Sequence, residues 1–130
     1  MFIAKRHKRA IEAFALADAD GNVVKTFEVS CDPEECLVEY NRARNNIIRA
    51  EQLLNSEPSA EGYAAYGQAV LDILAIFFGE ERTKEILAFF DDRYAEMVSE
   101  VMPFIVDVLE PRMREISKQQ LAQVKKRHQK

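Results

Sequence analysis

The chain has few of the residues from which most catalytic and metal sites are built. It contains two cysteines and two histidines in 130 residues, and the histidines, His7 and His128, lie near opposite ends. A zinc site needs about four Cys or His ligands close together. His7 lies in a basic cluster and His128 in the polar C-terminal segment, so neither is a positioned base. We therefore expect no metal, no cofactor and no catalytic residues, and we predict that the protein is not an enzyme.

Glycine and long apolar runs are also scarce. The four glycines form no glycine-rich phosphate loop. The most apolar run, residues 69–78, is interrupted by Asp72 and is shorter than the roughly 18 residues that a membrane span requires. The start, MFIAKRHKR, has no apolar segment after its basic residues and does not resemble a secretory signal. The net charge of −4 disfavours binding of the whole molecule to nucleic acid or anionic membrane. These features favour a cytoplasmic protein with no membrane or nucleic-acid partner.

The two cysteines flank a helix start. Asp32 has the character of an N-cap, Pro33 suits the first helical position, and Glu35 is placed to complete a capping box. Cys31 and Cys36 then occupy the two positions of a hydrophobic staple, which small buried thiols can fill. The spacing predicts structural thiols rather than metal ligands.

The N-terminal third predicts a β-hairpin. Residues 11–17 and 23–30 flank a turn cluster, residues 18–22, with Asp-Gly at its centre. A helix over residues 9–16 is an open alternative, because Ala and Glu favour one. The acidic turn resembles part of a calcium loop, but Leu16 stands where a further upstream ligand is needed, so turn chemistry is the better interpretation.

Helical periodicity fills the rest of the chain. It predicts four helices, over residues 33–54, 60–78, 80–90 and from about residue 92 onward. Gly79 stops the second helix. Pro103 should bend the last helix, and Pro111 should bend it again or end it. We therefore expect a mainly α fold, a helical bundle of about four helices with a short N-terminal β-hairpin.

These elements fit a single domain of residues 1–130. The hairpin takes residues 11–30, the helical body residues 32–116, and a polar, basic tail residues 117–130. The cationic end of this tail, residues 125–130, is expected to be frayed. The second half of the chain, residues 69–118, is dense in apolar residues and holds no histidine, cysteine or serine–base pair. Such a segment indicates a protein that works by contact.

The order of elements in this half resembles a known family. The segments FFGEERTKEILAFF (residues 77–90) and DDRYAEMVSEVMPFIVDVLEP (residues 91–111) carry the likeness, which covers roughly residues 32–118. They are similar to the tail assembly chaperones of siphophages, small helical proteins encoded just before the tape-measure protein. The resemblance implies a phage or prophage protein without catalytic residues. Its implied role is to coat the helical tape-measure protein, keep it soluble, and help recruit tail-tube subunits. It would act in the bacterial host cytoplasm and be absent from the mature virion.

Apolar residues of the last helix are the candidates for partner contact. A kinked helix of this length cannot pack along its whole length in a monomer of this size, so we expect self-association and binding of an elongated helical partner. Flexible methionines help such surfaces adapt, and the one beyond the second proline lies where the core should be thinning. The candidates are Met113, Ile116, Met102, Ile105 and Val108.

A different class of protein remains an alternative. A small regulatory or adaptor protein, of the transcriptional co-factor or antitoxin type, could use the basic residues 125–130 to bind its partner. A tape-measure gene immediately downstream would favour the chaperone.

Overall fold

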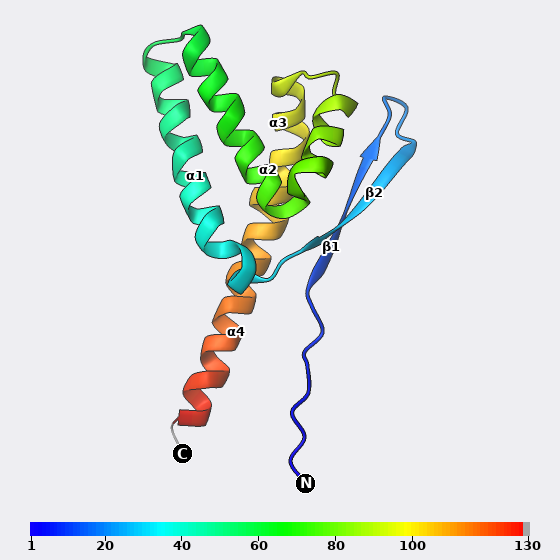
Figure 1. Ribbon diagram of the computed structural model, residues 1–130, viewed down its shortest axis with the longest axis vertical. Helices are drawn as coiled ribbons and strands as arrows, with labels where there is room; N and C mark the ends of the chain where they lie inside the picture. The colour runs from blue at the N-terminus through cyan, green and yellow to red at the C-terminus, as the bar shows by residue number, and fades with distance from the viewer. Residues whose placement is uncertain (129–130) are drawn as a thin grey trace.

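A computed structural model of the chain is mainly helical with an N-terminal two-stranded antiparallel hairpin, which confirms the predicted fold class (Figure 1). Helices make up 69% of the chain, well above the roughly one-third usual in globular domains. The backbone is described for residues 1–128 and the side chains for residues 1–126. The end of the predicted tail, residues 129–130, lies outside the described residues. The elements are β1 (Ile11–Ala17), β2 (Val23–Ser30), α1 (Pro33–Ser56), α2 (Ala60–Phe89), α3 (Tyr94–Pro103), the π-helical segment η1 (Phe104–Leu109) and α4 (Glu110–His128).

The molecule is broad at one end and narrow at the other. Figure 1 shows α1 and the first part of α2 on one side, the hairpin on the other, and α3 between them. The chain then runs from α3 through η1 into α4, which leaves the broad part and ends beside the N-terminal segment. We call residues 11–113 the body and residues 1–10 together with 114–128 the stem.

The hairpin is held by the turn chemistry that the sequence predicts. The Asp18 carboxylate accepts backbone N–H groups from Asp20 at 3.0 Å and from Asn22 at 2.9 Å. The bond from Asn22 is the main cause of the lowered pKa of Asp18. Residues 11–17 form a strand, so the alternative of a helix over residues 9–16 is wrong. Phe27 of β2 is buried in the core, which fixes the side of the hairpin that faces the helices.

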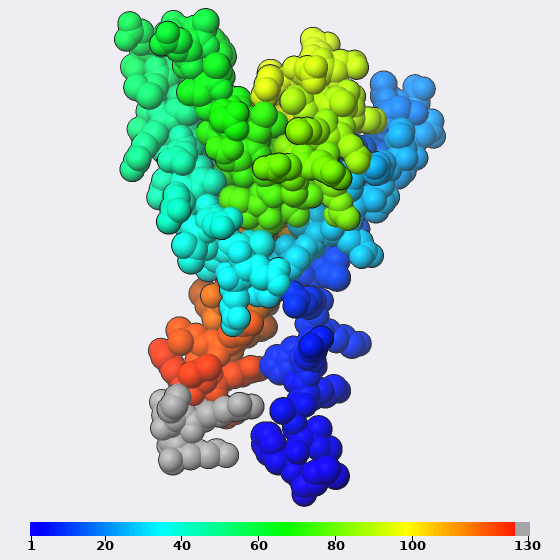
Figure 2. Space-filling model, viewed as in Figure 1, coloured from blue at the N-terminus to red at the C-terminus, as the bar shows by residue number. Residues whose placement is uncertain are grey.

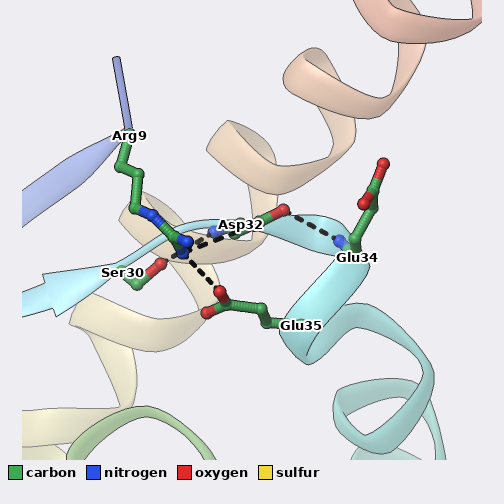
Figure 3. Close-up of polar contacts among 5 residues, drawn as sticks. All are labelled: Arg9, Ser30, Asp32, Glu34 and Glu35. Atoms are coloured by element: carbon green, nitrogen blue, oxygen red, sulfur yellow. Dashed lines mark hydrogen bonds and ion pairs between the residues drawn. The ribbon is translucent and has the colours of Figure 1, made fainter. Parts of the chain in front are cut away.

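Helix α1 begins at the predicted N-cap, but its capping box does not form. Asp32 accepts the backbone N–H of Glu34 at 3.0 Å, and its own N–H donates to Ser30 Oγ at 3.3 Å. Figure 3 shows the Glu35 carboxylate bonded to the guanidinium of Arg9 instead of turning back to Asp32. Arg9 also lies 4.0 Å from the Asp32 carboxylate. The prediction of a capping box is wrong, because the Glu35 carboxylate binds the guanidinium of Arg9 and not the backbone N–H of Asp32.

Both cysteines are free and buried in the hydrophobic core, as the staple prediction requires. Burial raises the pKa of Cys31 to about 11 and also raises the pKa of Cys36. The thiols therefore stay protonated at neutral pH, which suits packing and not thiolate chemistry.

Replacing both cysteines with alanine should lower the free energy of unfolding by on the order of 1 kcal/mol, because two small apolar contacts at the helix start are lost. Urea unfolding of Cys31→Ala/Cys36→Ala measures the change. Native mass spectrometry of the unaltered protein is the control. A bound metal that disappears in the double variant would contradict the staple.

Helix α2 consists of two helical segments that meet at Gly79, where the sequence predicts that one helix stops and the next begins. Gly79 has φ 81° and ψ 167°, a backbone conformation essentially restricted to glycine, and helical structure resumes directly after it. The hydroxyl of buried Thr83 donates to the Gly79 carbonyl at 2.7 Å. Figure 1 shows the two parts of α2 folded back at this point. The predicted break at Gly79 is therefore in the right place, and the second helical segment begins directly after it.

Helix α2 supplies much of the core. Among the described residues it is the one helix long and apolar enough to cross a membrane by length and composition. We interpret it as a core helix, because its apolar residues pack in the main hydrophobic cluster. The buried apolar residues of α2 are Ala69, Val70, Ile73, Leu74, Phe77, Phe78 and Ile86.

The two prolines of the last helix do not end it. Pro103 has no N–H, and the turns after it widen into η1, in which the N–H of Glu110 reaches back to Ile105. Pro111 lies in the first turn of α4, where a missing N–H is tolerated. Pro111 does not end the helix, because α4 continues past it to His128, so that part of the prediction for Pro111 is wrong. Helix α4 continues to His128, so the predicted fraying of residues 125–130 is wrong for residues 125–128.

Candidate interaction surface

The last helix contributes one continuous apolar stripe to the core. Val101, Ile105, Leu109 and Met113 follow one another at intervals of four residues, and each is 0% exposed. In a regular α-helix, four-residue steps drift by about 40° per step around the axis. The wider turns of η1 remove much of that drift, because π-helical turns hold more residues. Met113 is therefore a core residue, and the core thins after it rather than at Pro111.

Polar contacts fasten the start of α4 to the body. The hydroxyl of buried Tyr40 on α1 donates to the Glu110 carboxylate. Burial, together with this bond, raises the pKa of Tyr40. Arg112 lies 3.9 Å from Glu12 on β1. The first turn of α4 is thus held from two sides, which sets the direction in which the rest of the helix leaves the body.

The same apolar stripe continues past the body into solvent. Ile116, Leu121 and Val124 lie three, eight and eleven residues after Met113, and those spacings keep them on one helix face. Ile116 is half-buried, but Leu121 is 56% exposed and Val124 is 52% exposed. Figure 1 shows this length of α4 extending beyond the other helices. This face of α4 has the apolar residues of a buried helix face, but no other element within residues 1–126 covers it.

The N-terminal segment runs beside this overhanging helix. Figure 2 shows both projecting from the same end of the body. Arg9 fixes the segment to the start of α1, and Phe2 and Ile3 at its far end are 93% and 75% exposed. A groove of about 620 Å³ lies between segment and helix. It is lined by Arg6, His7, Lys8, Arg9, Ala10, Asp32, Arg112, Ile116, Gln119, Gln120 and Gln123.

The structure separates the five predicted contact residues into two groups. Met113 and Ile105 are core residues that a partner can reach only if the fold opens. Met102 and Ile116 are half-buried, and Val108 is 41% exposed. For these three the predicted contact stays a prediction. Leu121 and Val124 are exposed apolar residues that the prediction did not include, because residues 117–130 were assigned to a polar tail.

No protein-family model, curated protein or solved structure matches this chain. Its function is therefore inferred from the surface itself. Within residues 1–126, no three His, Cys, Asp or Glu side chains lie close enough together to hold a metal ion. The feature of the described residues that most needs a functional explanation is the uncovered apolar stripe of the stem.

Proposed function

We propose that this protein is a phage or prophage tail assembly chaperone that binds the helical tape-measure protein and keeps it soluble. The observation that carries the proposal is the apolar stripe that continues from buried Met113 to exposed Leu121 and Val124. The resemblance of residues 77–111 to that family supplies the identity of the partner.

A physical argument supports a helical partner for the stem. Isolated helices of fewer than about 12–15 residues are marginal in water, and most helices in proteins are stabilised by packing of an apolar face. Residues 114–128 extend α4 by about that length beyond its last fully buried residue, Met113. An elongated helical partner with its own apolar stripe would cover Leu121 and Val124 and stabilise this part of α4.

The role that follows is transient. The chaperone would coat the tape-measure protein in the bacterial cytoplasm and would then be displaced by the tail-tube protein. Self-association of the chaperone along a long partner belongs to the same proposal. The mature virion would not contain it.

Co-expression with the tape-measure protein tests this function. The tape-measure protein should be soluble with the chaperone and aggregated without it, and the two should co-purify. Apolar contact should survive salt of about 1 M, at which charge interactions reach only about 3 Å. Pull-downs at low and high salt therefore distinguish apolar capture from electrostatic binding.

Two results would favour the regulatory or adaptor protein instead. One is a tape-measure protein that stays aggregated in the presence of the chaperone. The other is binding that is lost when residues 125–130 alone are removed, because that removes charge and leaves Leu121 and Val124 in place.

A further inference from the structure

Charge is segregated along the long axis of the molecule. The stem, residues 1–10 and 114–128, holds nine lysines and arginines and one glutamate, a net charge of +8. The body, residues 11–113, holds eight lysines and arginines against 21 aspartates and glutamates, a net charge of −13. The overall charge of −4 hides this separation, because the two basic segments are far apart in sequence and meet only in the fold.

The acidic groups reach the end opposite the stem. Three chain reversals lie there in Figure 1: residues 18–22 of the hairpin, residues 57–61, which join α1 to α2 and include the first two residues of α2, and residues 90–93 between α2 and α3. We call these three reversals the crown. They contain one basic residue, Arg93, and six acidic ones, all exposed: Asp18, Asp20, Glu57, Glu61, Asp91 and Asp92.

Most of these charges are not neutralised within the chain. Arg9, Arg112 and Arg114 pair with carboxylates. Within residues 1–126, six exposed stem cations have no ion-pair partner: Lys5, Arg6, Lys8, Lys118, Lys125 and Lys126. Over the same residues the six acidic groups of the crown form no ion pair either.

The stem cations of α4 border the apolar stripe. Arg114, Lys118 and Lys125 follow one another at intervals of four and seven residues, so they share one face of α4. Leu121 lies three residues after Lys118 and four before Lys125, so it lies at the edge of this basic face, whereas Val124 lies farther round the helix. A partner on the basic face would therefore lie against Leu121 and leave Val124 accessible.

We propose that copies of this chain associate end to end, with the basic stem of one copy against the acidic crown of the next. The occupant is a second copy because the chain itself carries the complementary charge, at the opposite pole and on a broader surface. Such a contact joins two different surfaces, so it repeats and builds chains or rings instead of closing at a dimer. The inference uses the charges alone and does not depend on the proposed function.

Charge reversal at each pole tests the contact. The stem variant is Lys5→Glu/Lys8→Glu/Lys118→Glu/Lys125→Glu/Lys126→Glu, which changes the net charge of the stem from +8 to −2. The crown variant is Asp20→Lys/Glu57→Lys/Glu61→Lys, which changes the net charge of the crown from −5 to +1. Asp91 and Asp92 are left unchanged, because their φ angles of 54° and 60° suit aspartate better than lysine. Sedimentation of the full chain is measured over a range of concentrations at about 0.05 M and about 1 M salt.

The natural chain should form species larger than two copies at low salt, growing with concentration, and monomers at high salt. Each variant alone should be monomeric at low salt, because its two poles carry like charge. An equimolar mixture of the two variants should associate again, because each pole then meets its opposite. Circular dichroism at high salt checks that both variants fold.

Four results would overturn the proposal. They are a natural chain that is monomeric at low salt, one that stops at two copies, one that stays associated at about 1 M salt, and a variant mixture that does not associate. If the natural chain is monomeric and its stem instead binds a short DNA duplex, the stem's partner is nucleic acid. The salt dependence of the natural chain keeps the test valid if a variant fails to fold.

Discussion

Met113→Ala should lower the free energy of unfolding by about 2–5 kcal/mol, the cost typical of truncating a buried large side chain and leaving a cavity. Met113 is 0% exposed, and it continues the stripe of Val101, Ile105 and Leu109 at the point where α4 leaves the body. The helix start is held there by polar contacts, so the surroundings can relax only partly into the space. Urea unfolding followed by circular dichroism measures the change.

Met102→Ala is the matched control. It removes the same side chain from the same continuous helix, but Met102 is half-buried. We expect it to cost about 1 kcal/mol, the middle of the range for single substitutions. If Met113→Ala left stability unchanged and weakened partner binding, Met113 would be a contact residue, as the sequence predicts.

Local signals predicted the elements well. The Asp-Gly cluster gave the hairpin turn, Asp32 and Pro33 gave the start of α1, and Gly79 gave the break in α2. In each case a single residue type supplies a conformation or a hydrogen bond that its neighbours cannot. Such effects act within a few residues of the chain, so they can be read without the fold.

Features that depend on contacts distant in sequence were not predicted. Glu35 is bonded by Arg9, which is 26 residues earlier, and this contact replaces the expected capping box. The two basic segments form one stem only because α4 ends beside the N-terminal segment. Neither arrangement leaves a local pattern in the sequence.

The burial of Met113 was missed for a different reason. Four-residue spacing in a regular α-helix moves steadily off one face, so a stripe of that spacing is expected to leave the core. The turns of η1 after Pro103 restore the alignment. A proline followed by apolar residues at strict four-residue intervals is a signal that could have indicated this.

Leu121→Asn/Val124→Asn should abolish solubilisation of the tape-measure protein and weaken its binding by about 100-fold or more. Burying a leucine or valine side chain contributes about 1.5–3 kcal/mol each, and each 1.4 kcal/mol is tenfold in affinity. Asparagine adds no charge, so the stem charges on which the end-to-end contact depends stay as they are. Because Leu121 and Val124 are exposed, stability should change by no more than about 0.5 kcal/mol.

The matched control makes the same substitutions on α1. Leu53 and Val38 are 66% and 73% exposed, comparable with Leu121 and Val124, but they lie on α1 and are not part of the stem. Leu53→Asn/Val38→Asn should therefore leave solubilisation unchanged. Titration calorimetry and the soluble fraction after co-expression measure both pairs. If the α1 pair abolished binding and the stem pair did not, the partner would bind the α1–α2 side of the body, and the stripe of the stem would need another explanation.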